Sequence, residues 1–237
     1  MNSVTKSTAG DGGEFDHVET WVFDLDNTIY AARHSVFDQI DARMGSFIAG
    51  LLDLDPVAAR TVQKDYFRNH GTTLRGLMLN HQIDPEDFLD YVHDIDVSPI
   101  PPNPALGEAL DRLAGRKVIF TNGSTKHAEN VLGRLGVADH FEGVFDIAAA
   151  DYVPKPEPGP YHQLIERFAI DPRTAAMVED MARNLEPAAA LGMTTVWVRT
   201  RNDWGREHSD ADYVHHVIDD VADWLGAMAA GRRRPRG

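Results

Sequence analysis

Short apolar runs alternate along the chain with longer segments in which apolar residues recur at helical spacing. The short runs are rich in β-branched and aromatic residues, which is typical of buried strands. Strands are therefore expected at Thr20–Phe23, Lys117–Phe120, Gly143–Ile147, Ala175–Val178 and Thr194–Val198, with a short sixth strand at Tyr213–Val214. Helices are expected between them at Ser124–Leu135, Pro158–Phe168 and Asn184–Leu191. This alternation predicts an α/β fold, a Rossmann-like parallel sheet with helices on both faces.

One stretch breaks the alternation directly after the first predicted strand. Residues 33–98 show only helical spacing, which predicts helices at His34–Leu52, Pro56–Asn69, Thr73–His81 and Pro85–Ile95. Asp55–Pro56 and Asp84–Pro85 are typical helix starts, because the aspartate can cap the helix and proline suits its first turn. The sequence therefore predicts a small all-helical cap, residues 33–98, inserted into a discontinuous catalytic core of residues 17–32 and 99–230.

The two ends of the chain differ from the body in composition. Residues 1–16 are small and polar and lack the apolar segment of a signal peptide, so we expect a disordered arm. Residues 231–237 form a short basic tail, which we expect to be solvated. No apolar run approaches the roughly 20 residues that are needed to cross a bilayer. The sequence therefore predicts no membrane partner.

The formal net charge of −14 argues against the broad positive surface that a nucleic acid polymer requires. An anionic small molecule would have to be held by a few local cations or by a metal ion. The chain has no cysteine, which excludes disulfides, thiolate metal sites and a cysteine nucleophile. This composition suits a reducing, cytoplasmic compartment. Whether the protein is a monomer or a homodimer stays open.

Two aspartates follow the first predicted strand, in the segment Asp24-Leu25-Asp26-Asn27-Thr28. Alternate residues of an extended chain point the same way, so Asp24 and Asp26 can both face the end of the sheet. Two carboxylates this close repel one another unless a cation or a proton lies between them, and Mg²⁺ prefers such hard oxygen ligands. Taken alone, a pair of this kind is more often a turn with a helix cap.

Further polar residues follow the later strands. Thr121 and Asn122 come after the second strand at the start of a helix, where hydroxyl, amide and backbone N–H groups suit a phosphate. Lys155 lies between two prolines and can neutralise a carboxylate or a phosphoryl oxygen. The fourth strand ends in acid, and the candidates there for a metal ligand and its supporting partners are Glu179, Asp180 and Asn184.

As a set, the Asp-x-Asp-x-Thr segment, the strand-end threonine, the loop Lys-Pro and the strand-end acidic pair resemble the haloacid dehalogenase-like superfamily. The resemblance covers roughly residues 19–199. The predicted insert resembles the helical cap of the subfamily that contains phosphatases, phosphoglucomutases and dehalogenases. The fourth motif departs from the family pattern, since it reads Glu179-Asp180-Met181-Ala182-Arg183-Asn184 where many relatives have Gly or Asp first and Ser third.

The resemblance implies a Mg²⁺-dependent phosphomonoester hydrolase. Asp24 would be the nucleophile that forms an aspartyl-phosphate, and Asp26 would protonate the leaving group and then deprotonate the attacking water. Mg²⁺ would be bound by the carboxylates of Asp24 and Asp180 and by the backbone carbonyl of Asp26. The remaining residues would bind the phosphoryl group (Thr121, Asn122, Lys155), orient Asp24 (Lys155) or support the metal ligands (Glu179, Asn184).

Several activities are compatible with this resemblance. Dehalogenases of the superfamily lack the second aspartate of the first motif, and Asp26 is present here, which argues against halide displacement. Phosphomutase activity stays open, because the cap residues that exclude water in mutases are not identifiable from this sequence. A non-catalytic phospho-switch of the response-regulator type is a different class. Such receivers are about half as long and place their acidic pair on the first strand, so this alternative is disfavoured.

The segment Asp24–Tyr30 and the small cap resemble the pyrimidine 5′-nucleotidase branch, so a nucleoside 5′-monophosphate is the expected substrate. Phosphoglycolate or a sugar phosphate is the leading alternative. Candidate cap contacts to the substrate are Tyr30, Arg33 and His34. A place in the cap core is favoured for the aromatic side chain, and a solvated surface position explains Arg33 and His34 at least as well.

Overall fold

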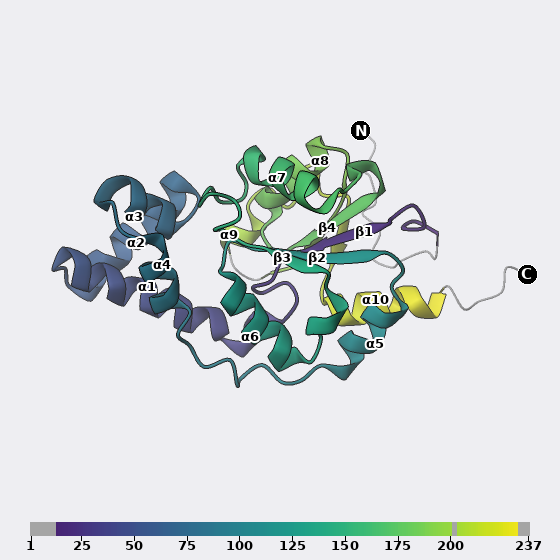
Figure 1. Cartoon of the computed structure of the whole chain (residues 1–237), viewed down its shortest axis with the longest axis horizontal. Coiled ribbons are helices and arrows are strands. Elements are labelled where there is room, and N and C mark those ends of the chain that lie inside the picture. Colours follow the sequence, from purple (N-terminus) through teal and green to yellow (C-terminus); the bar gives the residue numbers. More distant parts are fainter. Residues whose placement is uncertain (1–12, 201–202, 232–237) are drawn as a thin grey trace, which may run out of the picture.

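The computed structural model describes residues 13–200 and 203–231. It contains a six-stranded sheet in which every pairing is parallel, in the order β3-β2-β1-β4-β5-β6 (Figure 1). The strands are β1 Thr20–Phe23, β2 Arg116–Phe120, β3 Gly143–Phe145, β4 Ala175–Glu179, β5 Thr194–Val198 and β6 His216–Ile218. The predicted α/β fold is therefore confirmed. The strand order reverses at β1, and such a switch point favours ligand binding at the carboxyl ends of the strands.

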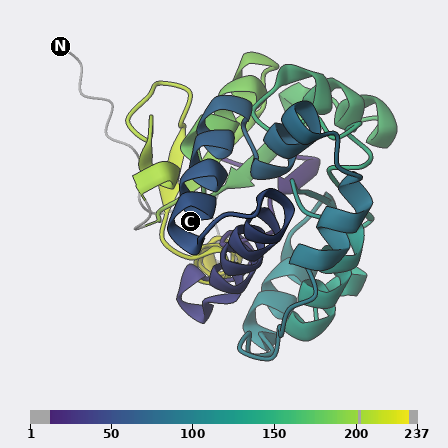
Figure 2. The same cartoon turned by 90° about the vertical axis from the view of Figure 1, so that its left-hand side faces the viewer.

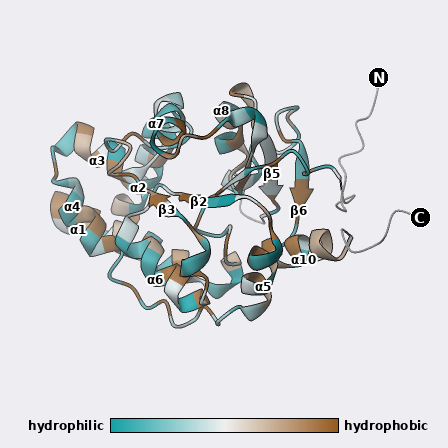
Figure 3. Cartoon of the chain, turned by 45° about the vertical axis from the view of Figure 1, so that its right-hand side comes forward, coloured by the Kyte–Doolittle hydropathy of each residue, from teal (hydrophilic) through white to brown (hydrophobic). Residues whose placement is uncertain are grey.

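Helices cover both faces of the sheet, because successive side chains of β1 point into two different hydrophobic clusters. Trp21 and Phe23 pack into the first cluster, with α5 (Pro104–Arg112), α6 (Thr125–Leu135) and α10 (Val221–Gly231). Val22 packs into the second, with α7 (Pro158–Phe168) and α8 (Leu185–Ala190). In Figure 3 the covering helices carry both hydrophobic and hydrophilic residues, as expected of helices that bury only one side.

The first four α-helices after β1 are α1 (Val36–Leu52), α2 (Pro56–His70), α3 (Thr73–His81) and α4 (Pro85–Val92). We call them the cap. They pack around a hydrophobic cluster of their own and stand beside one end of the sheet (Figures 1 and 2). Ile147, from the chain that follows β3, is 1% exposed and belongs to this cluster. The cap is therefore packed onto the core through a shared apolar side chain.

Two predicted helix starts are confirmed by their capping bonds. Asp55 Oδ1 accepts hydrogen bonds from the backbone N–H groups of Val57 and Ala58, at 2.8 and 3.1 Å. Asp84 Oδ1 accepts one from Glu86 at 2.9 Å. The first cap helix begins two residues later than predicted, because the 3₁₀ turn Ala32–His34 precedes it and the chain passes Ser35 with a φ of +53°.

The sixth strand lies later than predicted, since it starts at His216. Val214 is buried, which explains the apolar signal that suggested a strand there. The segment is linked to β5 by side-chain bonds instead of a strand ladder. The hydroxyl of Thr195 donates to the carbonyl of Tyr213, and the backbone N–H of Thr195 donates to His215 Nδ1 at 3.0 Å.

Residues 13–16 do not form part of a disordered arm, contrary to the prediction. Phe15 is 3% exposed, and its ring centroid lies 5.5 Å from that of Trp21, 5.4 Å from that of Trp224 and 4.8 Å from that of His216. This aromatic cluster joins the N-terminal segment to β1, β6 and α10. The rest of the predicted arm, residues 1–12, and the predicted tail from residue 232 onward lie outside the described residues.

We expect Phe15→Ala to lower the free energy of unfolding by about 3 kcal/mol, because it removes a buried ring from a packed aromatic cluster. Denaturant unfolding followed by tryptophan fluorescence measures this change. Leu79→Ala is the control, since Leu79 is 57% exposed on α3 and its loss should change stability by less than about 0.5 kcal/mol. Equal stability of the two variants would contradict the role assigned to Phe15.

Candidate active site

The predicted motifs meet at one edge of the sheet because the three central strands are parallel and in step. Phe23, the last residue of β1, pairs with Ile119 of β2 and with Val178 of β4. Asp24, which follows Phe23, and Glu179, the last residue of β4, therefore lie at the same level. This edge lies beside the cap (Figure 1).

Lys155 lies at the centre of the site. It is 2% exposed, and its Nζ donates to Asp24 Oδ1 at 2.8 Å and to Glu179 Oε2 at 2.7 Å. A third bond, of 2.8 Å, goes to the backbone carbonyl of Phe120, which uses all three protons of the ammonium group. The ion pairs raise the pKa of Lys155 above its ordinary value although burial opposes this. The ammonium group is therefore charged and fixed beside Asp24.

Three carboxylates share this region. Oxygen atoms of Asp24, Glu179 and Asp180 lie within 4.8 Å of one another, and all three residues are buried. Burial and the charge of Glu179 raise the pKa of Asp24 to about 7, and burial with the charges of Glu179 and Asp24 raises the pKa of Asp180 well above its ordinary value. The single ammonium group of Lys155 is thus insufficient to neutralise the three carboxylates. A hard divalent cation fits this all-oxygen set, because it would offset the excess negative charge.

Thr28 joins the first and fourth motifs. Its hydroxyl donates to Asp24 Oδ2 at 2.8 Å and accepts from the backbone N–H of Asp180 at 3.1 Å. Lys155 occupies the other oxygen of Asp24, so both carboxylate oxygens are held. Sequence reasoning placed Thr28 in the motif without giving it this role, although the Asp-x-Asp-x-Thr spacing contained the signal.

Asp26 has a different environment from Asp24. Its Oδ1 accepts hydrogen bonds from Tyr30 Oη at 2.6 Å and from His127 Nε2 at 2.8 Å. Burial would raise the pKa of Asp26, but the charge and hydrogen bond of His127 and the hydrogen bond of Tyr30 lower it overall. Sequence reasoning missed His127, because it lies 101 positions from Asp26 and only the fold brings the two together.

The two candidate phosphate-binding residues are held by different bonds. Thr121 is buried, and its Oγ1 accepts from the backbone N–H of Gly123 at 2.9 Å, which leaves its own proton available to a ligand. Asn122 Oδ1 accepts from the backbone N–H of Lys155 at 2.9 Å. The Asn122 side chain thus holds the lysine loop in place in this structure.

Asn184 is bonded to Glu179, one of the three carboxylates of the cluster. Asn184 Nδ2 donates to Glu179 Oε1 at 3.2 Å, while Glu179 Oε2 accepts from Lys155. The carbonyl of Asp180 is fixed as well, since Trp197 Nε1 donates to it at 2.7 Å. The supporting role expected for Glu179 and Asn184 stays a prediction.

A cavity of about 190 Å³ lies between this cluster and the cap. The core contributes the motif residues named above except Thr28, and the cap contributes an apolar wall that includes Ile40, Met44, Phe67 and Phe88. Trp204 of α9 (Asp203–Arg206) also lines the cavity, and its ring centroid lies 5.6 Å from that of Phe67. A ligand would thus have its polar end at the carboxylates and its other end against aromatic side chains.

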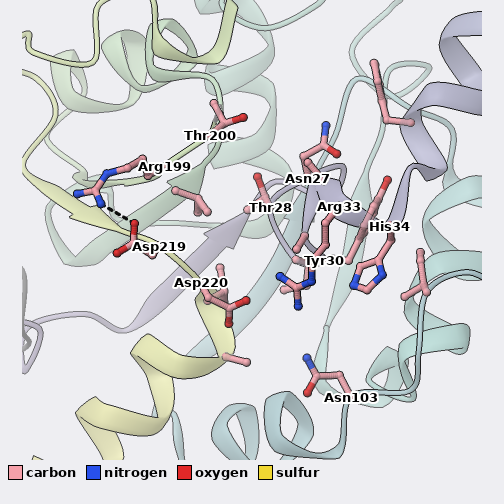
Figure 4. Close-up of a pocket in the computed structure, with 18 of the residues that line it drawn as sticks. Asn27, Thr28, Tyr30, Arg33, His34, Asn103, Arg199, Thr200, Asp219 and Asp220 are labelled. Carbon is pink, nitrogen blue, oxygen red and sulfur yellow. Dashed lines mark hydrogen bonds and ion pairs between the residues drawn. The ribbon is translucent and has the colours of Figure 1, made fainter. Parts of the chain in front are cut away.

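The three predicted cap contacts do not line this cavity among the described residues. Tyr30, Arg33 and His34 line a second cavity of about 1360 Å³, next to the ion pair of Arg199 and Asp219 (Figure 4). Tyr30 still reaches the catalytic cluster, since its hydroxyl bonds to Asp26. The structure brings the core motifs together and places Arg33 and His34 apart from them.

Comparison with known proteins agrees with this architecture. Residues 18–192 match the family described as haloacid dehalogenase-like hydrolases. Phosphate metabolism protein 8 of Saccharomyces cerevisiae is 27% identical over 197 residues, which are 74% of this chain and 60% of the yeast protein. The phosphoglycolate phosphatase of Neisseria gonorrhoeae is 26% identical over 198 residues, or 77% of this chain and 80% of that protein. The chain thus spans less than two thirds of the yeast relative.

Solved structures show the same fold. A HAD phosphatase from Thermococcus onnurineus is similar over 92% of this chain and 100% of its own, with a TM-score of 0.59 and 21% identity. L-2-haloacid dehalogenase from Xanthobacter autotrophicus is similar over 91% of this chain and 98% of its own, with a TM-score of 0.53 and 15% identity. With most of its length matched to one family and the motifs of that family assembled at one sheet edge, the chain belongs to the haloacid dehalogenase-like hydrolases.

Proposed function

We propose that this protein is a Mg²⁺-dependent phosphatase that hydrolyses nucleoside 5′-monophosphates, with pyrimidine nucleotides preferred. The observation that carries the proposal is the contrast between two neighbouring carboxylates. Lys155 and Thr28 each hold one oxygen of Asp24, and the fixed ammonium group favours its ionised form, as a nucleophile requires. Among the described residues Asp26 is bonded through Oδ1, to Tyr30 and His127, which leaves Oδ2 to give a proton to a leaving group or take one from water.

The reaction has two displacement steps at phosphorus. In the first, a carboxylate oxygen of Asp24 attacks, the ester P–O bond breaks, and Asp26 gives its proton to the leaving alkoxide. In the second, Asp26 takes a proton from water, the hydroxide attacks the aspartyl-phosphate, and the bond from phosphorus to Asp24 breaks. Inorganic phosphate leaves and Asp24 is restored. Lys155 and the Thr121 hydroxyl orient the transferring group and offset its charge.

The residues present fit a resident metal ion. The carboxylates of Asp24 and Asp180 and the backbone carbonyl of Asp26 would hold Mg²⁺, with Glu179 and Asn184 supporting the acidic cluster. When bound, the ion supplies positive charge to the phosphoryl oxygens and to the crowded carboxylates.

The cavity favours a neutral, flat leaving group over a second anion. Among the described residues that line it, the lysines are Lys64 and Lys155, and each is already bound to a carboxylate. Lys64 Nζ lies 2.6 Å from Asp41 Oδ1. Phe67 and Trp204 also line the cavity and give it an aromatic surface that a nucleobase can pack against. Phosphoglycolate carries a carboxylate in addition to its phosphate, and this second anionic group would need an unpaired cation.

Phosphoglycolate and sugar phosphates remain the alternative substrates, because the relative from Neisseria gonorrhoeae is named a phosphoglycolate phosphatase.

In the described part of the chain no helix is long and apolar enough to cross a bilayer. A small-molecule phosphate ester is the partner that the site suits. A cytoplasmic location and a monomeric or homodimeric state stay predictions.

Asp24→Asn should reduce phosphate release by at least about a thousandfold, because an amide does not attack phosphorus. Steady-state phosphate release measures this, and circular dichroism tests whether the fold is kept. Asp53→Asn is the matched control, since Asp53 is exposed at the end of α1 and its left-handed φ of +53° is tolerated by asparagine. A variant at Asp24 with near wild-type turnover would rule out this nucleophile.

Mg²⁺ should raise the melting temperature of the wild type, because an ion that binds only the folded state stabilises it. Asp180→Asn should weaken this effect and increase the Mg²⁺ concentration for half-maximal activity by about tenfold or more, since a ligand is lost. Thermal unfolding across a Mg²⁺ titration, with excess EDTA as the reference, gives a readout that is independent of turnover. Identical Mg²⁺ dependence in wild type and variant would remove Asp180 from the metal site.

Phosphate release from a panel of esters should be fastest with UMP and CMP, slower with AMP and slowest with phosphoglycolate, given the apolar wall and the paired lysines. The comparison uses kcat/KM for each ester at saturating Mg²⁺. Higher values for phosphoglycolate or sugar phosphates would keep the mechanism and discard the nucleotide preference. Label transfer from a bisphosphorylated sugar to a second hydroxyl would indicate a mutase, and one stoichiometric phosphorylation without turnover would indicate a switch.

A further inference from the structure

Both hydrogen bonds to the Asp26 carboxylate end on the same oxygen atom. Tyr30 Oη and His127 Nε2 reach Oδ1, at 2.6 and 2.8 Å, and Oδ2 accepts no hydrogen bond from the described residues. Two donors on one oxygen fix the rotation of a carboxyl group about its Cβ–Cγ bond. They also suit both of its protonation states, because a carboxylic acid can carry its proton on Oδ2 while Oδ1 still accepts. Asp26 itself lines the catalytic cavity.

The His127 ring is held in an unusual way. Its side chain is 0% exposed, yet its Nδ1 has no hydrogen-bond partner in the described structure. A functional histidine is usually oriented by a bond to its second ring nitrogen, and that bond is missing here. The ring lies instead against His93, with centroids 4.6 Å apart and planes 7° apart. Stacking therefore takes over the orienting role.

His93 belongs to the cap. It follows directly after α4, and its Nδ1 lies 2.9 Å from the hydroxyl of Ser124, the residue that caps α6. His127 lies in the first turn of the same helix. The cap thus contacts the core at the ring that holds Asp26. If the cap moved away, His127 would lose its stacking contact with His93, which keeps its Nε2 directed at Asp26.

We propose that His127 is a positioning residue for Asp26 and that His93 makes this positioning depend on contact between cap and core. The proposal rests on the proposed function, because it assigns Asp26 the proton transfers of phosphate ester hydrolysis. Its consequence is that the acid–base group is aligned only when the cap covers the cavity. Proton delivery to the leaving group is thereby restricted to the closed enzyme.

The test compares two esters that differ in their need for an acid. An alkyl phosphate, taken as the fastest one of the panel above, requires protonation of its leaving oxygen, while 4-nitrophenyl phosphate releases a stable anion. The parameter is kcat/KM, which reports the steps up to cleavage of the ester bond. His127→Phe keeps a flat ring but removes the donor. It should lower kcat/KM for the alkyl ester by about a hundredfold and for the nitrophenyl ester by less than about threefold.

Further variants separate positioning from packing. His127→Gln restores an N–H donor and should recover most of the kcat/KM that His127→Phe loses on the alkyl ester. Tyr30→Phe should shift the ratio of kcat/KM for the two esters in the same direction as His127→Phe. On the cap side, His93→Ala should also shift this ratio, whereas His93→Phe, which keeps a stacking ring, should leave the ratio within about threefold of wild type. His81→Leu is the control for general loosening of the cap, because His81 contacts Tyr66 within it and should leave the ratio unchanged.

The outcomes separate this inference from the proposed function. If the wild type hydrolyses neither ester, the proposed function fails and the inference falls with it. If the wild type is active but His127→Phe affects both esters equally or neither, the inference alone is overturned. If His127→Phe does not fold, the ratios of Tyr30→Phe, His93→Ala and His93→Phe decide. If the ratio of kcat/KM for the two esters is unchanged in all three variants, the positioning role is rejected. If the ratio shifts in Tyr30→Phe and His93→Ala but not in His93→Phe, the role is supported.

Discussion

The site depends on one buried ammonium group among carboxylates. Lys155 is the cation that satisfies Asp24 and Glu179, and its third proton bonds to the end of β2. A buried charge of this kind is stable only when its partners are fixed in place. The parallel register of β1, β2 and β4 supplies that fixation, because it brings the ends of the three strands to one level. The fold is thus the means by which like charges are held together.

Two carboxylates only two positions apart acquire opposite properties from this arrangement. The environment of Asp24 is crowded with acids, which raises its pKa, while His127 and Tyr30 lower that of Asp26. Burial acts on both groups in the same direction, so the difference comes from their partners. Asp24 is held by elements of the core alone. Asp26 is held by His127, which in turn lies against the cap.

Local signals predicted the parts of the structure that depend on neighbours in the chain. Asp55 and Asp84 cap the helices that they were expected to start, and the motif residues lie at the predicted strand ends. Interactions between distant segments could not be predicted in this way. The bond from His127 to Asp26 spans 101 positions, and the position of the last strand depends on side-chain bonds to Thr195. Tyr30, Arg33 and His34 follow the first motif closely in the sequence, but they line another cavity, and Tyr30 reaches Asp26 only through its hydroxyl.

The burial of Ile147 inside the cap cluster bears on the resting equilibrium of the enzyme. This side chain comes from the core, yet its apolar neighbours are cap residues. Exposing an isoleucine to water costs about 1.5–3 kcal/mol, which corresponds to a factor of roughly 10 to 150 in population. Any separation of the cap from the core would have to expose this side chain to water, so the contact disfavours such a separation by about that factor. Replacing the isoleucine by a smaller side chain would reduce this cost.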